Sequence, residues 1–254
     1  MHHTDRDIRL AAALLEAADT LTEGFDTGQY LQRLSDHCVE LLSARAAGVM
    51  LIDAGRAVSV AGSSHQECLA LELLEAQHGG GPCRDSYGSG RPVPPVSIRA
   101  AHEDARWPDF TERALAHDIA TTYAVPLRRH QTLLGALNVF VPPGNGAEEA
   151  GLPLAQVLAD AAAVGLHNQR AFAQYRSLAG QLQEALSSRV RIEQAKGMLA
   201  ERWNTTADDA FGALRRYARG RRMPLDLVAR AVVERSVDEA ELRGEGGGAS
   251  GGPA

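Results

Sequence analysis

The sequence predicts an α+β domain, followed by a long coiled-coil helix and a small all-α module of three helices. Short apolar segments alternate with amphipathic ones between residues 24 and 150, which is typical of a domain that mixes strands and helices. From Leu154 to Arg202 no proline occurs, and apolar residues keep a seven-residue rhythm. Beyond residue 187 the chain becomes basic and carries two further helix signatures.

Composition narrows the class of protein. The 254 residues are 44% hydrophobic and 23% charged, which is ordinary for a globular chain. No apolar run approaches the ~20 residues of a membrane span, and the first ten residues lack the apolar core of a signal peptide. We therefore expect a cytoplasmic protein with no membrane contact. The three cysteines have no C-x-x-C spacing, so we expect reduced thiols and no metal site.

Residues 1–23 are predicted to form an N-terminal amphipathic helix, because apolar side chains recur at helical spacing between acidic ones. The domain at 24–150 should begin with a helix over 27–44. Two strands are expected around the Asp53-Ala54-Gly55 turn, at 46–53 and 56–63. The remaining elements are a helix at 66–78 that ends in "GGGPC", a proline-rich edge strand at 91–98, a helix at 107–119, and strands at 121–129 and 131–143.

The connecting helix, predicted over 151–186, carries two apolar series with seven-residue spacing. One series contains Leu154, Ala161, Asn168, Tyr175 and Leu182; the other contains Val157, Val164, Ala171, Leu178 and Ala185 and continues to Ile192. The residues expected to widen this seam are Leu158, Phe172, Ala179 and Leu186. Such a and d positions favour a parallel homodimer, and Asn168 is the kind of polar residue that fixes the register of the two helices. The alternative is a helix folded back onto its own domain.

The C-terminal module is predicted over 187–240, before a low-complexity tail at 241–254 that should be disordered. Between residues 187 and 235 we count eleven Lys or Arg and six Asp or Glu, a net charge of +5 in a chain of −6. This asymmetry indicates a polyanionic partner. Gly197 lies inside the first helix, where we expect it to let a second helix approach closely. The expected core contains Ala195, Met198, Leu199, Phe211, Leu214, Leu225, Val228 and Val232.

Three motifs in this module carry a resemblance to a known family. They are Ala-Lys-Gly at 195–197, Ala-Phe-x-x-Leu-Arg at 210–215 and Val-Ala-x-x-Val-Val at 228–233. Residues 192–233 resemble the ANTAR domain, an RNA-binding antiterminator module, along their whole length. The preceding segment resembles the GAF sensor domain in "GGGPCRDSYGSGRPV", "RWPDF" and "GALNVF". The resemblance implies a dimer that recognises paired RNA hairpins in nascent transcripts and thereby regulates transcription by antitermination.

The candidate RNA-binding residues are basic side chains outside the expected core, together with one tyrosine. Neutralised phosphates release counterions, and unstacked loop bases can stack on aromatic or guanidinium planes. The candidates are Lys196, Arg202, Arg215, Arg216, Tyr217, Arg219, Arg221 and Arg222.

Two other functions stay open at this stage. The C-terminal helices could bind DNA as a helix-turn-helix, and the GAF-like domain could be a cysteine-dependent methionine sulfoxide reductase. We expect the protein not to be an enzyme, because the cysteine positions match no catalytic pattern and no Ser/His/Asp constellation, carboxylate pair or P-loop stands out. We also expect no cofactor. A GAF domain can bind a small-molecule effector, and Cys83 would border that pocket as a redox-sensitive or a structural thiol. A signal there could act on RNA binding through the packing of the long helix around Asn168.

Overall fold

The computed structural model describes residues 2–22, 24–53, 56–144 and 151–244. The chain divides into two compact units, residues 1–173 and 174–254, which are described separately below. The boundary falls inside one continuous helix, α7 (Gly151–Trp203). Within the described ranges, no helix combines the length and the apolar character that crossing a membrane requires.

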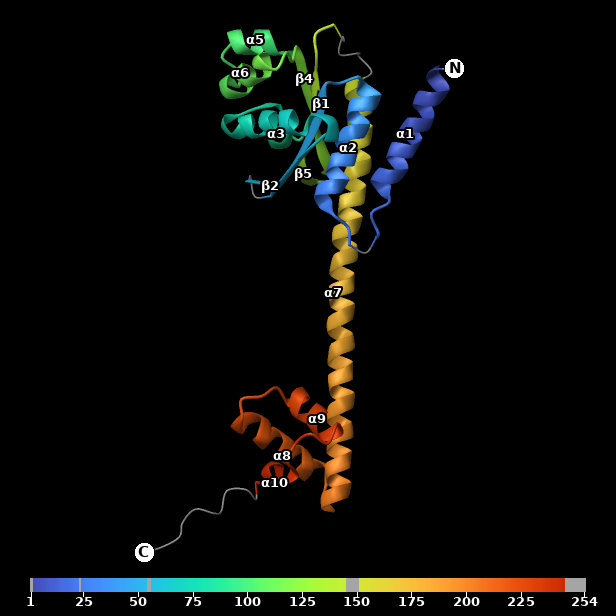
Figure 1. Cartoon of the computed structure of the whole chain (residues 1–254), viewed down its shortest axis with the longest axis vertical. Coiled ribbons are helices and arrows are strands. Elements are labelled where there is room, and N and C mark those ends of the chain that lie inside the picture. The colour runs from blue at the N-terminus through green and yellow to red at the C-terminus, as the bar shows by residue number, and fades with distance from the viewer. Residues whose placement is uncertain (1, 23, 54–55, 145–150, 245–254) are drawn as a thin grey trace, which may run out of the picture. The chain divides into compact units, whose positions relative to one another are not determined.

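Unit 1 is built on a five-stranded antiparallel sheet of order β2-β1-β5-β4-β3 (Figure 1). The strands are β1 (Ala46–Asp53), β2 (Arg56–Gly62), β3 (Val93–Ser97), β4 (Thr121–Arg129) and β5 (Thr132–Val141). The proline-rich β3 lies at an edge, where a missing backbone donor costs least. The central strands are buried on both faces, so each face needs its own covering layer.

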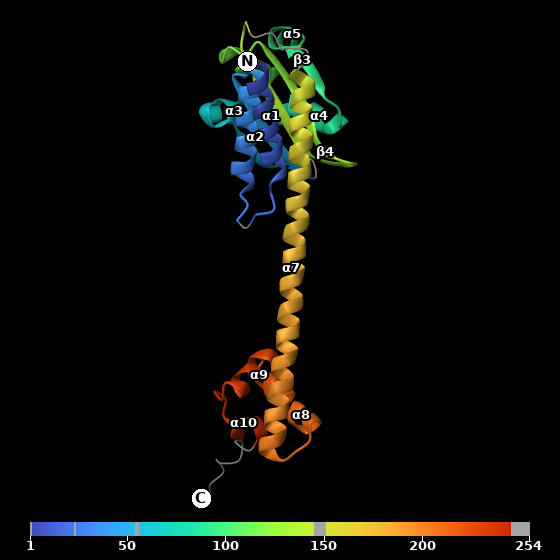
Figure 2. The ribbon, with the colours of Figure 1, turned by 90° about the vertical axis from the view of Figure 1, so that its right-hand side faces the viewer.

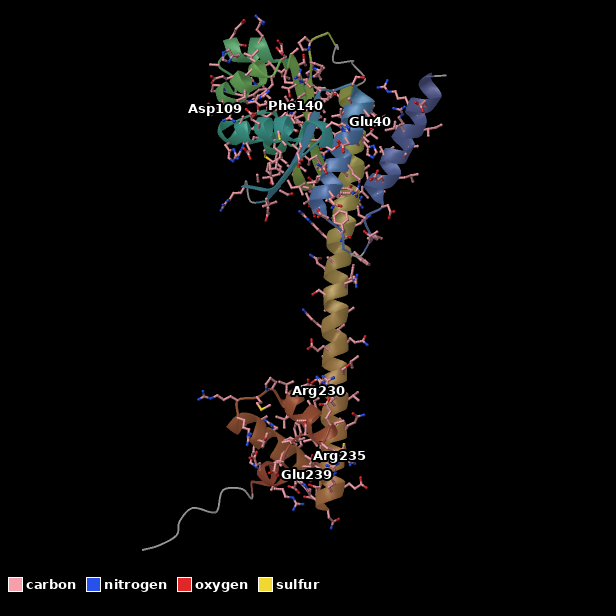
Figure 3. The ribbon with its side chains drawn as sticks, in the orientation of Figure 1. Glu40, Asp109, Phe140, Arg230, Arg235 and Glu239 are labelled. Atoms are coloured by element: carbon pink, nitrogen blue, oxygen red, sulfur yellow. The ribbon has the colours of Figure 1, made fainter. Side chains whose placement is uncertain are left out.

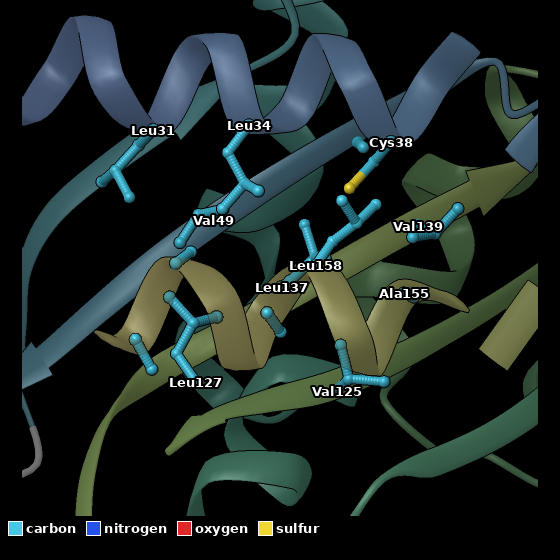
Figure 4. Close-up of a cluster of buried hydrophobic side chains, with 14 of the residues drawn as sticks. Leu31, Leu34, Cys38, Val49, Val125, Leu127, Leu137, Val139, Ala155 and Leu158 are labelled. Atoms are coloured by element: carbon cyan, nitrogen blue, oxygen red, sulfur yellow. The ribbon is translucent and has the colours of Figure 1, made fainter. Parts of the chain in front are cut away.

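Helices α1 (His2–Ala18), α2 (Thr27–Leu42) and the first part of α7 cover one face of the sheet (Figure 2). Asp26 begins α2 by accepting the Gln29 N–H at 3.0 Å. In Figure 4, Leu34 and Cys38 of α2 point toward the strands and toward Leu158 of α7, and all three are buried. These helices and the strands beneath them share one continuous apolar core.

The opposite face is covered by short helices. They are α3 (Glu67–Glu75), α4 (Pro82–Ser89), α5 (Ile98–Glu103) and α6 (Pro108–Ala116), with 3-10 turns η1 (Ser64–Gln66) and η2 (Ala76–Gly79). A second core lies between them and the sheet and includes Phe110 and Phe140. The sequence predicted α3 and α6 but not α4 or α5. Instead of being only a turn, "GGGPC" leads into α4, with Pro82 as its first residue.

The end of α1 is fixed to α7 at a glycine. Thr20 donates its hydroxyl to the carbonyl of Gly165 at 2.8 Å, and Tyr30 donates its hydroxyl to the carbonyl of Ala17 at 2.7 Å. A Cβ atom on Gly165 would lie 2.1 Å from the Ala17 carbonyl oxygen. Only glycine therefore permits this approach of the two helices.

Helix α7 has two distinct apolar faces. One face packs inside unit 1 and consists of Ala155, Leu158, Ala159, Ala162, Ala163 and Leu166. At about 100° per residue, the predicted a and d series lies on the opposite side of the helix. Val157 on that side is 46% exposed, and beyond Ala173 the exposed fraction of Leu178 is 53% and that of Leu182 is 58%. The helix thus packs on its own domain mainly through the first face. Two residues of the predicted seam take part in that packing, because Leu158, predicted to widen the seam, is fully buried there and Leu154 lies partly buried against the same core.

Unit 2 consists of the last part of α7, α8 (Ala207–Gly220), α9 (Leu225–Val233) and α10 (Glu239–Arg243). Its core contains Ala195, Leu199, Leu214, Val228 and Val232, as predicted, whereas Met198, Phe211 and Leu225 are only partly buried. The prediction of a disordered tail from residue 241 was wrong at its start. Helix α10 continues to Arg243, and Leu242 is only 3% exposed in the core. The rest of the predicted tail, 245–254, lies outside the described residues.

Candidate nucleic-acid interface

Helix α8 separates an apolar face from a basic face. Thr206 begins the helix by accepting the Asp209 N–H at 3.1 Å, and its hydroxyl donates to the Asp209 carboxylate at 2.6 Å. The hydrogen bonds from Thr206 and Thr205 lower the pKa of Asp209. From this start the helical period places Ala210, Ala213, Leu214 and Ala218 in the core.

The opposite face of α8 carries three of the candidate residues. Arg215, Arg216 and Arg219 are exposed, and at about 100° per residue they lie within one third of the helix circumference. We call these three residues the outer basic face. Its position opposite the core means that a polyanion can reach all three guanidinium groups without disturbing the packing of the unit.

Lys196 on α7 extends this surface. Its Nζ lies 5.9 Å from the ring centre of Phe211, and the guanidinium of Arg215 lies 5.7 Å from the same ring. Lys196 also pairs with Glu193 at 2.7 Å, one turn earlier on α7. The structure thus brings the predicted Lys196 next to the outer basic face through a shared aromatic ring.

Three other candidates lie against α10 rather than on the outer basic face. Arg202 pairs with Glu239, and Arg221 pairs with Glu241. Tyr217 is partly buried and donates its hydroxyl to Glu241 at 3.4 Å, while the Arg221 guanidinium lies 4.7 Å from its ring centre. The eight predicted residues therefore do not form one surface.

The last candidate, Arg222, is exposed in the turn between α8 and α9, where it has a φ of 54°. A non-glycine residue in this left-handed region ends the helix. Arg222 therefore follows the outer basic face in sequence without sharing the geometry of the helix.

An ion pair that the sequence did not reveal fixes α9 against α7. Arg191 donates two hydrogen bonds to Asp226, Nε to Oδ1 at 2.9 Å and Nη2 to Oδ2 at 2.8 Å. The hydrogen bond from Arg191 lowers the pKa of Asp226. The two residues are 35 positions apart, so no local pattern could have paired them. Arg191, one of the basic residues of the charged segment, therefore contributes to the packing of α9 on α7.

Gly197 does not have the role that the sequence suggested. It is exposed, and a Cβ atom placed on it would have no neighbour within 4 Å. No helix of unit 2 approaches it, so the expectation of a close helix contact there was wrong. The surface of α7 at Gly197 is open backbone.

The candidate residues of unit 1 are less exposed. Cys83 is fully buried at the start of α4, and burial raises the pKa of its thiol. Its backbone N–H donates to the Gln77 side chain at 2.8 Å, so the amide that an anion would use is already paired. Burial also raises the pKa of Cys38 to about 12, whereas Cys68 is exposed. These environments favour a structural Cys83.

The remaining sequence predictions concern the position of Asn168 and the absence of a metal site. Asn168 is partly exposed on the seam side of α7, away from the face that packs on the sheet. In the part of the chain that the structure describes, no three His, Cys, Asp or Glu side chains gather in a group that could hold a metal ion.

Unit 2 is thus a small helical module that carries the outer basic face opposite its core. Residues 180–233 match the family model of the ANTAR domain, so the C-terminal unit contains an ANTAR domain. ANTAR domains are RNA-binding antitermination modules. A search of curated proteins found no significant match.

The described fold of unit 1 is similar to several solved structures. One is the GAF domain of a phosphoenolpyruvate-protein phosphotransferase from Coxiella burnetii, at 18% identity and a TM-score of 0.47, covering 65% of this chain and 96% of that one. Another is the GAF domain of the cyanobacteriochrome TePixJ (18%, 0.45, 60% and 96%). A third is the free methionine-R-sulfoxide reductase from Neisseria meningitidis (17%, 0.43, 63% and 87%). The chain thus joins an ANTAR domain to an N-terminal α+β unit similar to GAF domains.

Proposed function

We propose that this protein is an RNA-binding antitermination regulator whose ANTAR domain binds paired hairpins in nascent transcripts. The observation that carries the proposal is the outer basic face of Arg215, Arg216 and Arg219, which lies opposite the core of a matched ANTAR domain. Guanidinium groups on adjacent helical turns can neutralise successive phosphates and can also stack on unpaired loop bases. Lys196 beside Phe211 enlarges the same surface.

The proposal includes a homodimer formed through α7. The seam that contains Tyr175, Leu178 and Leu182 is exposed in the single chain, and such an apolar stripe needs a partner. A second copy offers the same stripe in the same register, with Asn168 as the polar residue that fixes it. Two joined ANTAR domains would engage two hairpins at once, and the second contact would gain from effective concentration.

In this proposal residues 24–150 form a GAF sensor domain, and residues 151–186 connect it to the RNA-binding part at 187–240. A signal on the sensor changes the packing of α7 around Asn168 and so sets whether both domains reach RNA. The effector is a small molecule whose identity is unassigned. Burial of Cys83 favours such an effector over oxidation of that thiol.

The test is binding of the full-length protein to a two-hairpin RNA across a salt series. The variant Arg215→Ala/Arg216→Ala/Arg219→Ala is expected to lose at least tenfold in affinity. It should also lose about 0.7–0.9 in the log–log salt slope for each phosphate contact removed. The matched control is Arg189→Ala/Arg230→Ala/Arg235→Ala, which removes the same charge from exposed positions of unit 2 outside α8.

Two outcomes would contradict the proposal. Equal losses in both triple variants would show that only net charge matters. A wild-type protein that prefers duplex DNA to the hairpins in direct competition would instead support the helix-turn-helix alternative.

A further inference from the structure

Helix α10 lies beyond the residues that match the ANTAR family, which end at 233. It is nevertheless packed into the fold of unit 2. Asp238 begins it by accepting the Ala240 N–H at 2.9 Å, and Leu242 is buried in the core. Residues 236–244 contain three acidic side chains and one basic one, so this addition is acidic where the preceding module is basic.

The first acidic contact is made by Glu239, which is labelled in Figure 3. One carboxylate oxygen pairs with Arg202, and the other accepts the Trp203 indole N–H at 3.3 Å. The guanidinium of Arg243, also on α10, lies 4.9 Å from the ring centre of Trp203. The end of α7 is thus in contact with α10 through both a charge and an aromatic ring.

The second acidic contact is made by Glu241. One of its carboxylate oxygens pairs with Arg221 and also accepts the Tyr217 hydroxyl at 3.4 Å. Two α10 carboxylates therefore pair or hydrogen-bond with three of the eight candidate RNA-binding side chains, Arg202, Tyr217 and Arg221. A carboxylate and a phosphate bind the same donors of a guanidinium group with similar geometry, so both cannot use those donors at once.

We propose that α10 is an internal competitor of RNA, which holds Arg202, Tyr217 and Arg221 and leaves the outer basic face as the surface open to phosphates. This inference rests on the proposed RNA-binding function and adds Glu239 and Glu241 as residues that limit the RNA contact area. The ion pairs are partly exposed, with Arg221 51% and Glu241 45% exposed at the side chain. Exposed pairs of this kind are weak and screened by salt, so RNA can compete with them.

The test compares the wild type with Glu239→Gln/Glu241→Gln, both full length and both on the two-hairpin RNA. Glutamine keeps the size of each side chain and leaves Leu242 in place, so a thermal unfolding curve should confirm a folded unit 2. We expect affinity to rise about three- to tenfold at low salt, which is the order of two exposed ion pairs. The salt slope should steepen by about 0.7–0.9 for each guanidinium that gains a phosphate.

The matched control is Glu184→Gln/Glu201→Gln, which removes the same two charges from exposed positions of unit 2 outside α10. An equal gain in the control would overturn the inference, because the effect would then be one of net charge. If the wild type prefers the hairpins but the α10 variant binds them no more tightly than the wild type does, this inference alone is overturned. A wild type without that preference would overturn the proposed function and this inference with it.

Discussion

Among single residues of unit 2, some basic side chains form ion pairs within the fold and others are exposed. Arg191 is committed to Asp226 by two hydrogen bonds and so joins α7 to α9. Arg215, Arg216 and Arg219 are exposed on α8 and are not part of any such pair in the described contacts. A count of basic residues treats all of them alike. Only the first kind supports the fold, and only the second kind is presented to a ligand.

The pair between Arg191 and Asp226 predicts a pH dependence of stability. The pKa of Asp226 is lowered in the folded state, so its contribution is present above an unfolded-state pKa of about 3.9 and is lost as the pH falls through the folded-state value. Asp226→Asn should lower the unfolding midpoint of unit 2 at pH 7 and leave it unchanged relative to wild type near pH 2. Thermal unfolding followed by circular dichroism from pH 7 to 2 measures this difference.

Arg191→Ala is the control for that experiment, since it removes the partner and should erase the same acid-dependent difference. A midpoint at pH 7 that is equal in wild type and Asp226→Asn would show that the pair contributes nothing to stability.

At the scale of elements, two glycines of α7 have opposite surroundings. Gly165 faces the Ala17 carbonyl oxygen, which a Cβ atom would approach to 2.1 Å, whereas Gly197 faces open space. In the sequence both are isolated glycines within a helix, and both carry the same intrinsic cost of about 1 kcal/mol relative to alanine. The tertiary contact decides which of them is required.

Alanine substitution should therefore have opposite effects at the two positions. Gly165→Ala forces the backbone at Ala17 away from α7 and should destabilise unit 1 by about 1–3 kcal/mol, the usual cost of overpacking. Gly197→Ala should stabilise α7 by up to about 1 kcal/mol. Urea unfolding of each variant provides the comparison. Destabilisation by Gly197→Ala would mean that the helix surface there is covered in the folded protein.

At the scale of the whole molecule, α7 is the element shared by both units. Its sheet-facing side is satisfied within unit 1, and its other side keeps Leu178, Leu182 and Leu186 more than half exposed. The two alternatives from the sequence, a helix packed on its own domain and a helix in a dimer, are thus not exclusive, because they use largely different faces of α7.

The dimer proposal predicts the behaviour of Leu178→Gln/Leu182→Gln. Light scattering should show a shift from dimer to monomer, because two apolar seam positions become polar. Affinity for a two-hairpin RNA should fall by about a hundredfold toward the single-hairpin value, as the gain from effective concentration is lost. Ala173→Gln, exposed on the opposite side of α7, should change neither. A monomeric wild type, or an unchanged dimer in the double variant, would contradict the proposed seam.

Local sequence patterns were sufficient to predict the order of the main elements, the five strands, the long helix and the basic character of the last module. These follow from local periodicity, turn residues and charge, which need no knowledge of distant contacts. Helices α4, α5 and α10 were missed, because helices of five to eight residues have too few turns to show a period. Helix α10 illustrates this, because a single buried side chain, Leu242, anchors it in the core, and one apolar residue makes no periodic pattern.

Which basic residues remain exposed depends, by contrast, on the packing of distant segments. Arg215 and Arg221 look equivalent in the sequence, yet one is on the outer face of α8 and the other is held by Glu241. The tertiary structure also decided that Cys83 is buried and that Gly197 is open. Each of these properties depends on which distant segment packs against the residue, and that information is absent from any local pattern.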